Sequence, residues 1–373
     1  MNTRTLSTRV IPSALGVLAL AGSTVAAADA DQSPPDQAKM AKHKVIADEL
    51  DNPRQLSLTP GGKLLVAQAG HGSYDPANCI GEGEEAQCVG ATGKITVIDS
   101  GDRWNPIAHL LSAAGPDGTF AVGSDGASKR RGGPYYAIIT YAPPDLMPEG
   151  VPGEQAGKLI AKKPGGKAHV VADISKYEEN HDPDGEGVES NPYSVLAQKK
   201  RVLVADAAGD TVYQVRKGKV RVFHKMKEYG KKVDAVPTSL ATDARTGNIL
   251  VGELHSEMPG KAKVWSLKQN GKVARTWKGF TTVTGVARAK NGTLYVSELF
   301  GGTCGFEDIP TCFPGRVVRV LPNGKRKAYA VPFPAGVVVK HGKPYVAAFS
   351  IAPSTGAMGN PNWNGQIWRL NQR

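Results

Sequence analysis

The sequence predicts an all-β protein, a six-bladed β-propeller closed by pairing an N-terminal strand with the last blade. Three observations support this fold: one two-strand unit recurs, its copies are evenly spaced, and the two ends of the chain complement each other. Helical periodicity is nearly absent, so the apolar segments are expected to be strands. A pair of two-sheet sandwiches is the rival architecture, but it would not require an even repeat.

The repeated unit is an apolar strand, often led by proline, then a polar turn and a second apolar strand that ends in a polar or small residue. Its copies join residues 52–58 to 64–68, 191–196 to 202–206, 237–241 to 249–253, 283–287 to 294–298 and 334–339 to 345–348. Successive aligned ends lie 47, 45 and 50 residues apart, the length of one four-stranded blade, at Asp206, Glu253, Glu298 and Ala348. Third strands are predicted at 211–215, 263–267 and 316–320.

One degenerate blade fits between the first and the next clear copy, with residues 134–141 as its central strand. The chain ends on a third-strand pattern at 365–370, and residues 44–50 resemble the missing fourth strand. Pairing these segments closes the ring and leaves few free strand edges. We therefore predict a single propeller domain over residues 44–373.

The first 28 residues have the pattern of a secretory signal peptide. Arg4 and Arg9 precede an apolar run over 10–25, which is followed by small residues. We expect cleavage near residue 28, a flexible lead-in over 29–43, and an extracellular mature chain without a membrane-spanning segment.

Export favours disulfides as the role of the four cysteines. Cys79 and Cys88 are nine residues apart and Cys304 and Cys312 are eight apart, so two local disulfides are expected. A four-cysteine metal site is the alternative, although neither pair has the short gap typical of zinc ligands.

Several segments resemble the ScyD/ScyE-type extracellular propellers, within the wider group of NHL, SMP-30/gluconolactonase and virginiamycin-lyase-like six-bladed folds. The most specific are Ser-Asn-Pro-Tyr at 190–193 and the cysteine loop; the others lie at 51–54, 66–72 and 204–207. The resemblance spans about residues 44–370 and implies the fold, with no single reaction common to the family. The second blade departs from the common repeat at 129–134.

Residues at equivalent strand ends of different blades are expected to converge around the propeller axis. Three of them, Asp206, Glu253 and Glu298, are carboxylates, and we predict that they bind one divalent cation, calcium or magnesium. The amide of Gln68 occupies the same position and is a candidate ligand-binding group. The alternative is that these side chains bond backbone amides within the fold.

Two histidines, His71 and His255, follow strand ends closely and are candidate acid–base residues. The virginiamycin-lyase-like relatives use channel histidines with a carboxylate, although a lone loop histidine is more often structural. Asn191 and Tyr193 are candidate ligand-binding residues, with packing between blades as the alternative for Tyr193.

The segment 180–185, Asn-His-Asp-Pro-Asp-Gly, resembles the first half of a calcium loop. It fails at the twelfth position, where Asn191 replaces the required glutamate, so we interpret it as a capped loop after a short helix over 174–179.

The formal net charge of +12 falls to +10 once Arg4 and Arg9 are removed. The lysines cluster in turns without aromatic interleaving, so nucleic acid is not the expected partner. An anionic cell-wall polymer is the better candidate for an exported chain, and simple solubility is the alternative.

The chain has no G-x-S-x-G, H-E-x-x-H, P-loop or dinucleotide motif. Two functions therefore remain. The first is a secreted, monomeric propeller that binds a small molecule, polymer or protein on the top face of its channel. The second is a metal-dependent lactone hydrolase or lyase. An SMP-30-like metal site requires an inward Glu, Asn and Asp, whereas the blade starts here offer Asn52, Asn191 and Thr238, which favours binding.

Overall fold

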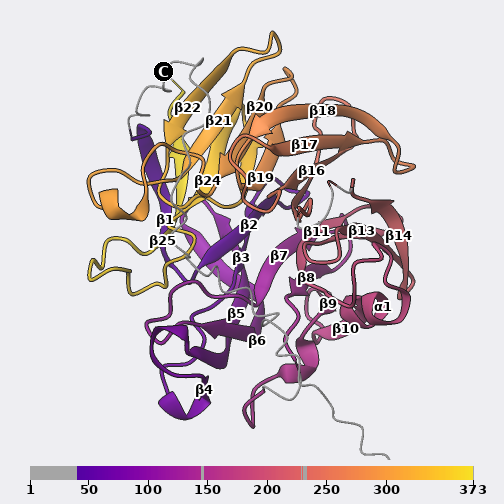
Figure 1. Cartoon of the computed structure of the whole chain (residues 1–373). Helices are drawn as coiled ribbons and strands as arrows, with labels where there is room; N and C mark the ends of the chain where they lie inside the picture. The colour runs from indigo at the N-terminus through magenta and orange to yellow at the C-terminus, as the bar shows by residue number, and fades with distance from the viewer. Residues whose placement is uncertain (1–39, 144–146, 228, 230–232, 373) are drawn as a thin grey trace, which may run out of the picture.

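Six antiparallel sheets form the blades of a propeller in the computed structural model, which describes residues 40–143, 147–227, 229 and 233–372 (Figure 1). The predicted fold class is confirmed. The predicted signal peptide lies outside the described residues, as does most of the lead-in. The described part of the lead-in, residues 40–43, contacts the propeller, since the Ala41 amide donates to the Ala330 carbonyl at 2.9 Å.

The strands follow the chain blade by blade, from the inner strand outward. Blade 1 contains β2 (Pro53–Leu58), β3 (Leu64–Gln68), β5 (Gln87–Asp99) and β6 (Asp102–Ala114), with β4 (Cys79–Ile80) paired to the start of β5. Blade 2 contains β7 (Ser124–Lys129), β8 (Tyr135–Ile139), β9 (Lys158–Lys162) and β10 (His169–Asp173). Blade 3 contains β11 (Pro192–Ala197), β12 (Val202–Asp206), β13 (Thr211–Arg216) and β14 (Lys219–Lys225).

The last three blades repeat this arrangement. Blade 4 contains β15 (Pro237–Thr242), β16 (Ile249–Glu253), β17 (Ala262–Leu267) and β18 (Val273–Phe280). Blade 5 contains β19 (Val283–Arg288), β20 (Leu294–Glu298), β21 (Arg316–Val320) and β22 (Arg326–Ala330). Blade 6 contains β23 (Val337–Lys340), β24 (Lys343–Ala348), β25 (Gly365–Leu370) and β1 (His43–Leu50).

Burial explains why the second strand of a blade is an unbroken apolar run in the sequence. Every residue of β3, β12, β16 and β20 is buried, because each of these strands is covered by a neighbouring blade on both faces. The outer strand β14 is largely exposed and correspondingly polar. Six hydrophobic clusters, one between each pair of adjacent blades, make up the main core.

The ring closes as the sequence predicts. Strand β1 pairs antiparallel with β25, and His43 lies opposite Leu370. Side chains of β1, Ala47 and Leu50, also pack against Leu56 and Leu64 of blade 1. The N-terminal strand therefore completes blade 6 and joins it to blade 1.

The inner strands approach one another closely around the axis. A Cβ atom on Gly285 of β19 would lie 2.6 Å from the Ala335 carbonyl oxygen and 2.8 Å from the Val337 amide nitrogen. Glycine is therefore required where blades 5 and 6 meet.

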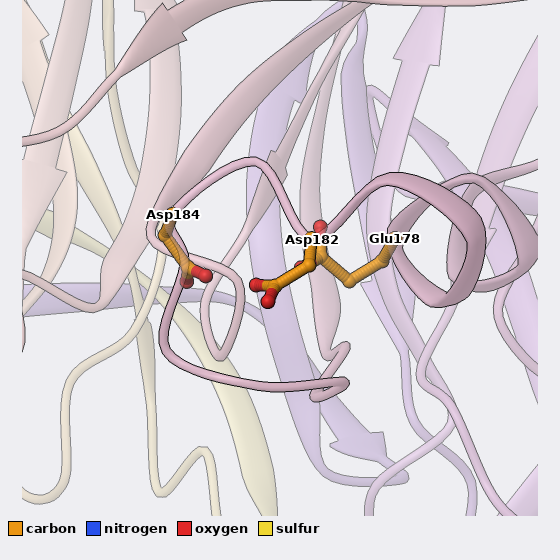
Figure 2. Close-up of side chains that lie close together, drawn as sticks. All are labelled: Glu178, Asp182 and Asp184. Atoms are coloured by element: carbon orange, nitrogen blue, oxygen red, sulfur yellow. The ribbon is translucent and has the colours of Figure 1, made fainter.

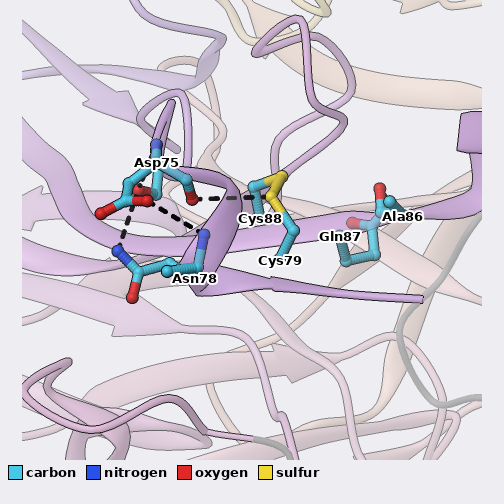
Figure 3. Close-up of a disulfide and its surroundings, with 8 residues drawn as sticks. Asp75, Asn78, Cys79, Ala86, Gln87 and Cys88 are labelled. Atoms are coloured by element: carbon cyan, nitrogen blue, oxygen red, sulfur yellow. Dashed lines mark hydrogen bonds between the residues drawn. A yellow bond between two sulfur atoms is a disulfide. The ribbon is translucent and has the colours of Figure 1, made fainter. Parts of the chain in front are cut away.

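Both predicted disulfides are formed, and no cysteine of the chain is free. Cys79 and Cys88 link β4 to β5, beside a turn in which the Asp75 carboxylate accepts a hydrogen bond from the Ala77 amide (Figure 3). The one α-helix of the described residues, α1 (Ile174–His181), extends two residues beyond the predicted end. None of the helices described here combines the length and apolarity of a membrane span.

Candidate functional site

The second strand of each blade, which lies next to the inner strand, is called its middle strand. The middle strands end on the face of the propeller where the inner strands begin, and we call this the top face. In five blades the last residue of the middle strand pairs with the first residue of the inner strand. This last residue is Ile139 in blade 2, opposite Ser124, and it is polar in the other four, at Pro53–Gln68, Pro192–Asp206, Pro237–Glu253 and Val283–Glu298. The equivalence of these strand ends, inferred from the repeat, is therefore correct. All four side chains are buried, however, and each is held by local partners.

The Asp206 carboxylate accepts hydrogen bonds from Ser190 Oγ at 2.7 Å and from the Asn191 amide at 2.6 Å. Burial raises the pKa of Asp206 to about 6, although these hydrogen bonds act in the opposite direction. Gln68 fills the same role in blade 1, because its Oε1 accepts from the Asp51 amide at 2.7 Å and its amide group donates to Thr96. Both residues stabilise the turn that leads into the inner strand.

Glu253 and Glu298 are paired with cations inside their own blades. Trp265 Nε1 donates to Glu253 at 2.7 Å, and Lys263 Nζ lies 3.4 Å from the same carboxylate. Arg316 binds Glu298 from the neighbouring strand β21. Burial raises the pKa of both glutamates, and these cations oppose that effect. The three predicted metal ligands, Asp206, Glu253 and Glu298, are not among the described side chains whose ligand atoms come within 4.8 Å of one another.

The two candidate histidines lie in different surroundings. His255 is buried, with Nδ1 3.3 Å from a Glu253 oxygen, and burial lowers its pKa. His71 stacks on Tyr74 with ring centroids 4.6 Å apart, and its buried Nδ1 has no hydrogen-bond partner among the described residues. His71 therefore retains an unused ring nitrogen at the top face.

A β-bulge near the start of the inner strand brings a different set of residues to the axis. In five blades the ladder to the middle strand skips one or two residues of the inner strand. A bulged residue is unpaired and its side chain is redirected. The skipped residues are Arg54 with Gln55, Asp125, Tyr193, Thr238 and Thr284.

Gln55 occupies the centre of this ring. Its Oε1 accepts hydrogen bonds from the amides of Ala127 and Val195, and its Nε2 donates to the carbonyl oxygens of Val195 and Leu240 at 3.0 and 3.4 Å. One side chain from blade 1 thus bonds blades 2, 3 and 4. It therefore ties the inner strands of these blades to blade 1.

Arg54 and Asp125, two of the bulged residues, form a buried ion pair with 3.6 Å between Arg54 Nε and Asp125 Oδ1. Neither atom has a hydrogen-bond partner among the described residues. Burial raises the pKa of Asp125 to about 6, although Arg54 opposes the shift. Limited access to water also raises the pKa of Tyr193 to about 12. Three adjacent blades therefore place an incompletely satisfied guanidinium, a carboxylate and a phenol around the channel.

The top face also carries an apolar pocket of about 130 Å³ beside blades 6, 1 and 2. Its lining is mostly aromatic and aliphatic, with two polar residues, Asp117 and Thr119, at the rim; the apolar members are Phe120, Phe333, Phe349, Ile351, Ala352, Ala357, Met358 and Trp363. The His71–Tyr74 stack borders this rim, because a Cβ on Gly118 would lie 3.3 Å from the Cβ atoms of His71 and Pro353.

Asn52 holds the loops of this pocket together. It is buried with φ of 46°, a left-handed conformation that asparagine tolerates better than most residues. Its Nδ2 donates to the carbonyls of Gly70 and Gly118 at 2.8 Å, and its Oδ1 accepts from the Ala121 amide at 3.2 Å. The predicted ligand residue Asn191 has an analogous structural role, since its Oδ1 accepts from Thr140 Oγ1 at 2.6 Å.

Two further features lie away from the channel. A pocket of about 470 Å³ on the opposite face is lined by three arginines, Arg245, Arg275 and Arg288. A carboxylate cluster of Glu178, Asp182 and Asp184 lies at the end of α1 (Figure 2), and it is the one group of metal-ligating side chains within 4.8 Å of one another in the described part of the chain.

Gln55 and Asp125 were not predicted as site residues from the sequence, and Arg54 contributed only to the family resemblance. A usable signal was present, because Arg54, Tyr193 and Thr238 each directly follow the proline that opens an inner strand. Glu178 was missed because only the loop after it was compared with a calcium site.

No protein-family model matches the chain, and no curated protein is significantly similar to it. Solved structures are similar in fold. A putative oxidoreductase (glucose dehydrogenase) from Thermus thermophilus is 14% identical with a TM-score of 0.50, over 89% of this chain and 100% of that one. A streptogramin B lyase is 12% identical with a TM-score of 0.49, over 88% and 96% of the two chains. A putative gluconolactonase is 12% identical with a TM-score of 0.48, over 91% and 94%. The likeness to the Thermus thermophilus protein concerns the fold alone.

Proposed function

We propose that this chain is a secreted propeller of the ScyD/ScyE type that binds a small molecule with an apolar ring on its top face. The observation that carries the proposal is the aromatic pocket beside the channel. Small-molecule sites are concave and mostly apolar, with a few polar groups that fix orientation. The lining of Phe120, Phe349 and Trp363 with Asp117 and Thr119 at the rim has this composition.

The volume of the pocket limits what it accepts. A cavity of about 150 Å³ lined by apolar side chains accommodates benzene, so a pocket of about 130 Å³ suits one ring of similar size. The remainder of the molecule would extend over the top face. Phe120 lines the pocket, and the carbonyl of the next residue, Ala121, accepts a hydrogen bond from Arg54. Arg54 is thus bonded to the residue that follows the pocket lining, and we propose that the Arg54–Asp125 pair receives a polar group of the same ligand.

Titration of the full chain with indole and with phenol, followed by ligand-detected NMR, tests this proposal. We expect Trp363→Ala to weaken binding about tenfold, because it removes an aromatic wall. The matched control is Trp104→Ala, which removes a half-exposed tryptophan of β6 outside the pocket. Equal loss in both variants, or no binding of either probe to the wild type, would contradict the proposal.

A second candidate is binding of an anionic polymer on the opposite face. The 470 Å³ pocket there presents three guanidinium groups, and only Arg288 is paired with a carboxylate of the described residues, Asp243 at 2.9 Å. Co-sedimentation with a polyanion, compared between wild type and the Arg245→Gln/Arg275→Gln variant, measures this function. The binding is expected to weaken with salt.

The enzymatic alternative is a lactone hydrolase or lyase that uses a channel cation bound by Asp206, Glu253 and Glu298, with His71 or His255 as the acid–base residue. The local partners of these three carboxylates make it the weaker candidate. A panel of lactones and esters, assayed with added calcium or magnesium, tests it. Turnover that is lost in His71→Ala and kept in Trp104→Ala would favour the enzyme over the binding protein.

A further inference from the structure

The end of α1 gathers three carboxylates that the propeller fold alone does not require. Glu178 lies in the last turn of α1, Asp182 caps the helix, and Asp184 follows in the loop. One ligand oxygen from each lies within 4.8 Å of the other two, and Figure 2 shows the Glu178 and Asp182 side chains directed into the same space. Like charges at this separation repel one another, and a cation between them would relieve that repulsion.

Glu178 supplies an independent reason to expect a ligand. The residue is 0% exposed, and its Oε2 accepts a hydrogen bond from the Tyr213 hydroxyl, whereas its Oε1 is buried with no partner among the described residues. A buried carboxylate oxygen without a donor is costly. Because Glu178 lies beside Asp182 and Asp184, a cation shared by the three carboxylates would satisfy this oxygen.

A lysine and a further carboxylate lie close to the cluster. Lys225 Nζ donates to the Asp184 main-chain carbonyl at 2.9 Å, and Asp206 is close enough to Glu178 to contribute to the raised pKa of that carboxyl. The Asp182 carboxylate is already ordered, because its Oδ1 accepts hydrogen bonds from the Gly185 and Gly187 amides at 3.0 and 3.3 Å.

We infer that Glu178, Asp182 and Asp184 bind a calcium ion that fixes the loop after α1 to the end of the helix. Calcium binds oxygen ligands at about 2.3–2.6 Å, so two ligands of one ion can lie up to about 5 Å apart, and the three carboxylates lie within that limit. Magnesium gives up its water ligands reluctantly, so a site made of several protein carboxylates favours calcium. The remaining coordination positions are open to water and to loop carbonyls. This site is separate from the top-face pocket, and the inference does not depend on the proposed function.

The test is calcium titration of the full chain after chelator treatment, followed by calorimetry and thermal unfolding. We expect one calcium per chain, and a rise in melting temperature of about 4 °C at a hundredfold excess over Kd. Asp182→Asn/Asp184→Asn should abolish both. The matched control, Asp75→Asn/Asp308→Asn, removes two loop carboxylates that also accept from backbone amides, at 2.9 Å each, and should retain both.

Terbium luminescence gives a second measurement should the double variant fold poorly. Tyr213 is hydrogen-bonded to Glu178, so terbium at this site is excited through that ring. Tyrosine-sensitised emission from the wild type should be displaced by calcium and should fall in Tyr213→Phe. Absence of stoichiometric calcium binding, binding that persists in Asp182→Asn/Asp184→Asn, or magnesium binding as tight as calcium binding would overturn the inference.

Discussion

The Asp125→Asn substitution tests whether the channel ion pair is maintained at the expense of stability. Asp125 is 1% exposed, Arg54 Nε is 3.6 Å away, and the Gly123 amide donates to the carboxylate at 3.4 Å. Burial raises the pKa of Asp125 from 3.8 to about 6. Because the folded-state pKa lies above the unfolded value, ionisation opposes folding, and stability is lost as the pH rises through this interval.

The magnitude follows from the size of the shift. A change of about two pKa units corresponds to about 3 kcal/mol, at 1.36 kcal/mol per unit. Asparagine resembles the protonated aspartic acid and does not titrate. We therefore expect Asp125→Asn and wild type to have similar free energies of unfolding near pH 4, and the variant to be more stable by up to about 3 kcal/mol above pH 6.

Urea unfolding followed by tryptophan fluorescence across this pH range measures the difference, and differential scanning calorimetry should show it as about 4 °C in melting temperature. The exposed Asp102→Asn is the control for loss of a charge. A variant that is less stable than wild type at neutral pH would refute the reasoning, because it would mean that attraction to Arg54 exceeds the cost of burying the carboxylate.

Three further predictions concern the scaffold. Arg316→Met leaves the buried Glu298 carboxylate without its cation and should lower the free energy of unfolding by about 3 kcal/mol, whereas Arg316→Met/Glu298→Leu should recover part of that loss in the same denaturation assay. Replacing Cys79 and Cys88 with serine opens a loop closed over nine residues and should cost about 2.5 kcal/mol; reduction of the wild type also opens Cys304–Cys312 and should cost more. Deleting β1 (His43–Leu50) exposes the edge of β25 and should produce oligomers in size-exclusion chromatography, and a stable monomer would contradict the closure described above.

The sequence was sufficient for the fold because the signal is repeated. The middle strands are buried on both faces, so the same apolar run recurs in every blade, and the pairing of 44–50 with 365–370 follows from a missing fourth strand. Blade 2 was the least clear copy, and its middle strand β8 ends in Ile139 where the others end in a polar or small residue. Its inner strand nevertheless carries the channel acid Asp125.

The site was harder to predict because it depends on a one-residue irregularity. Side chains alternate along a strand, so a shift of one residue exchanges the blade interior for the channel. Asp206 and Tyr193 belong to neighbouring strands of one blade, yet the regular ladder places Asp206 in the interior and the bulge places Tyr193 toward the axis. Repeat alignment identifies equivalent positions, but it does not reveal which of them are bulged.

The bulge at the start of blade 1 gives its two residues different roles. Gln55 satisfies its amide group through blades 2, 3 and 4 and so stabilises the ring. Arg54, its neighbour in the same bulge, has a buried Nε that lies 3.6 Å from Asp125 and has no hydrogen-bond partner among the described residues. A polar ligand group that accepted a hydrogen bond from Arg54 would relieve part of the desolvation cost of the ion pair. Asp125→Asn should then stabilise the free protein and strengthen binding of a ligand that accepts a hydrogen bond from Arg54, because no carboxylate competes for the guanidinium, whereas a ring held by the pocket alone should bind both forms equally.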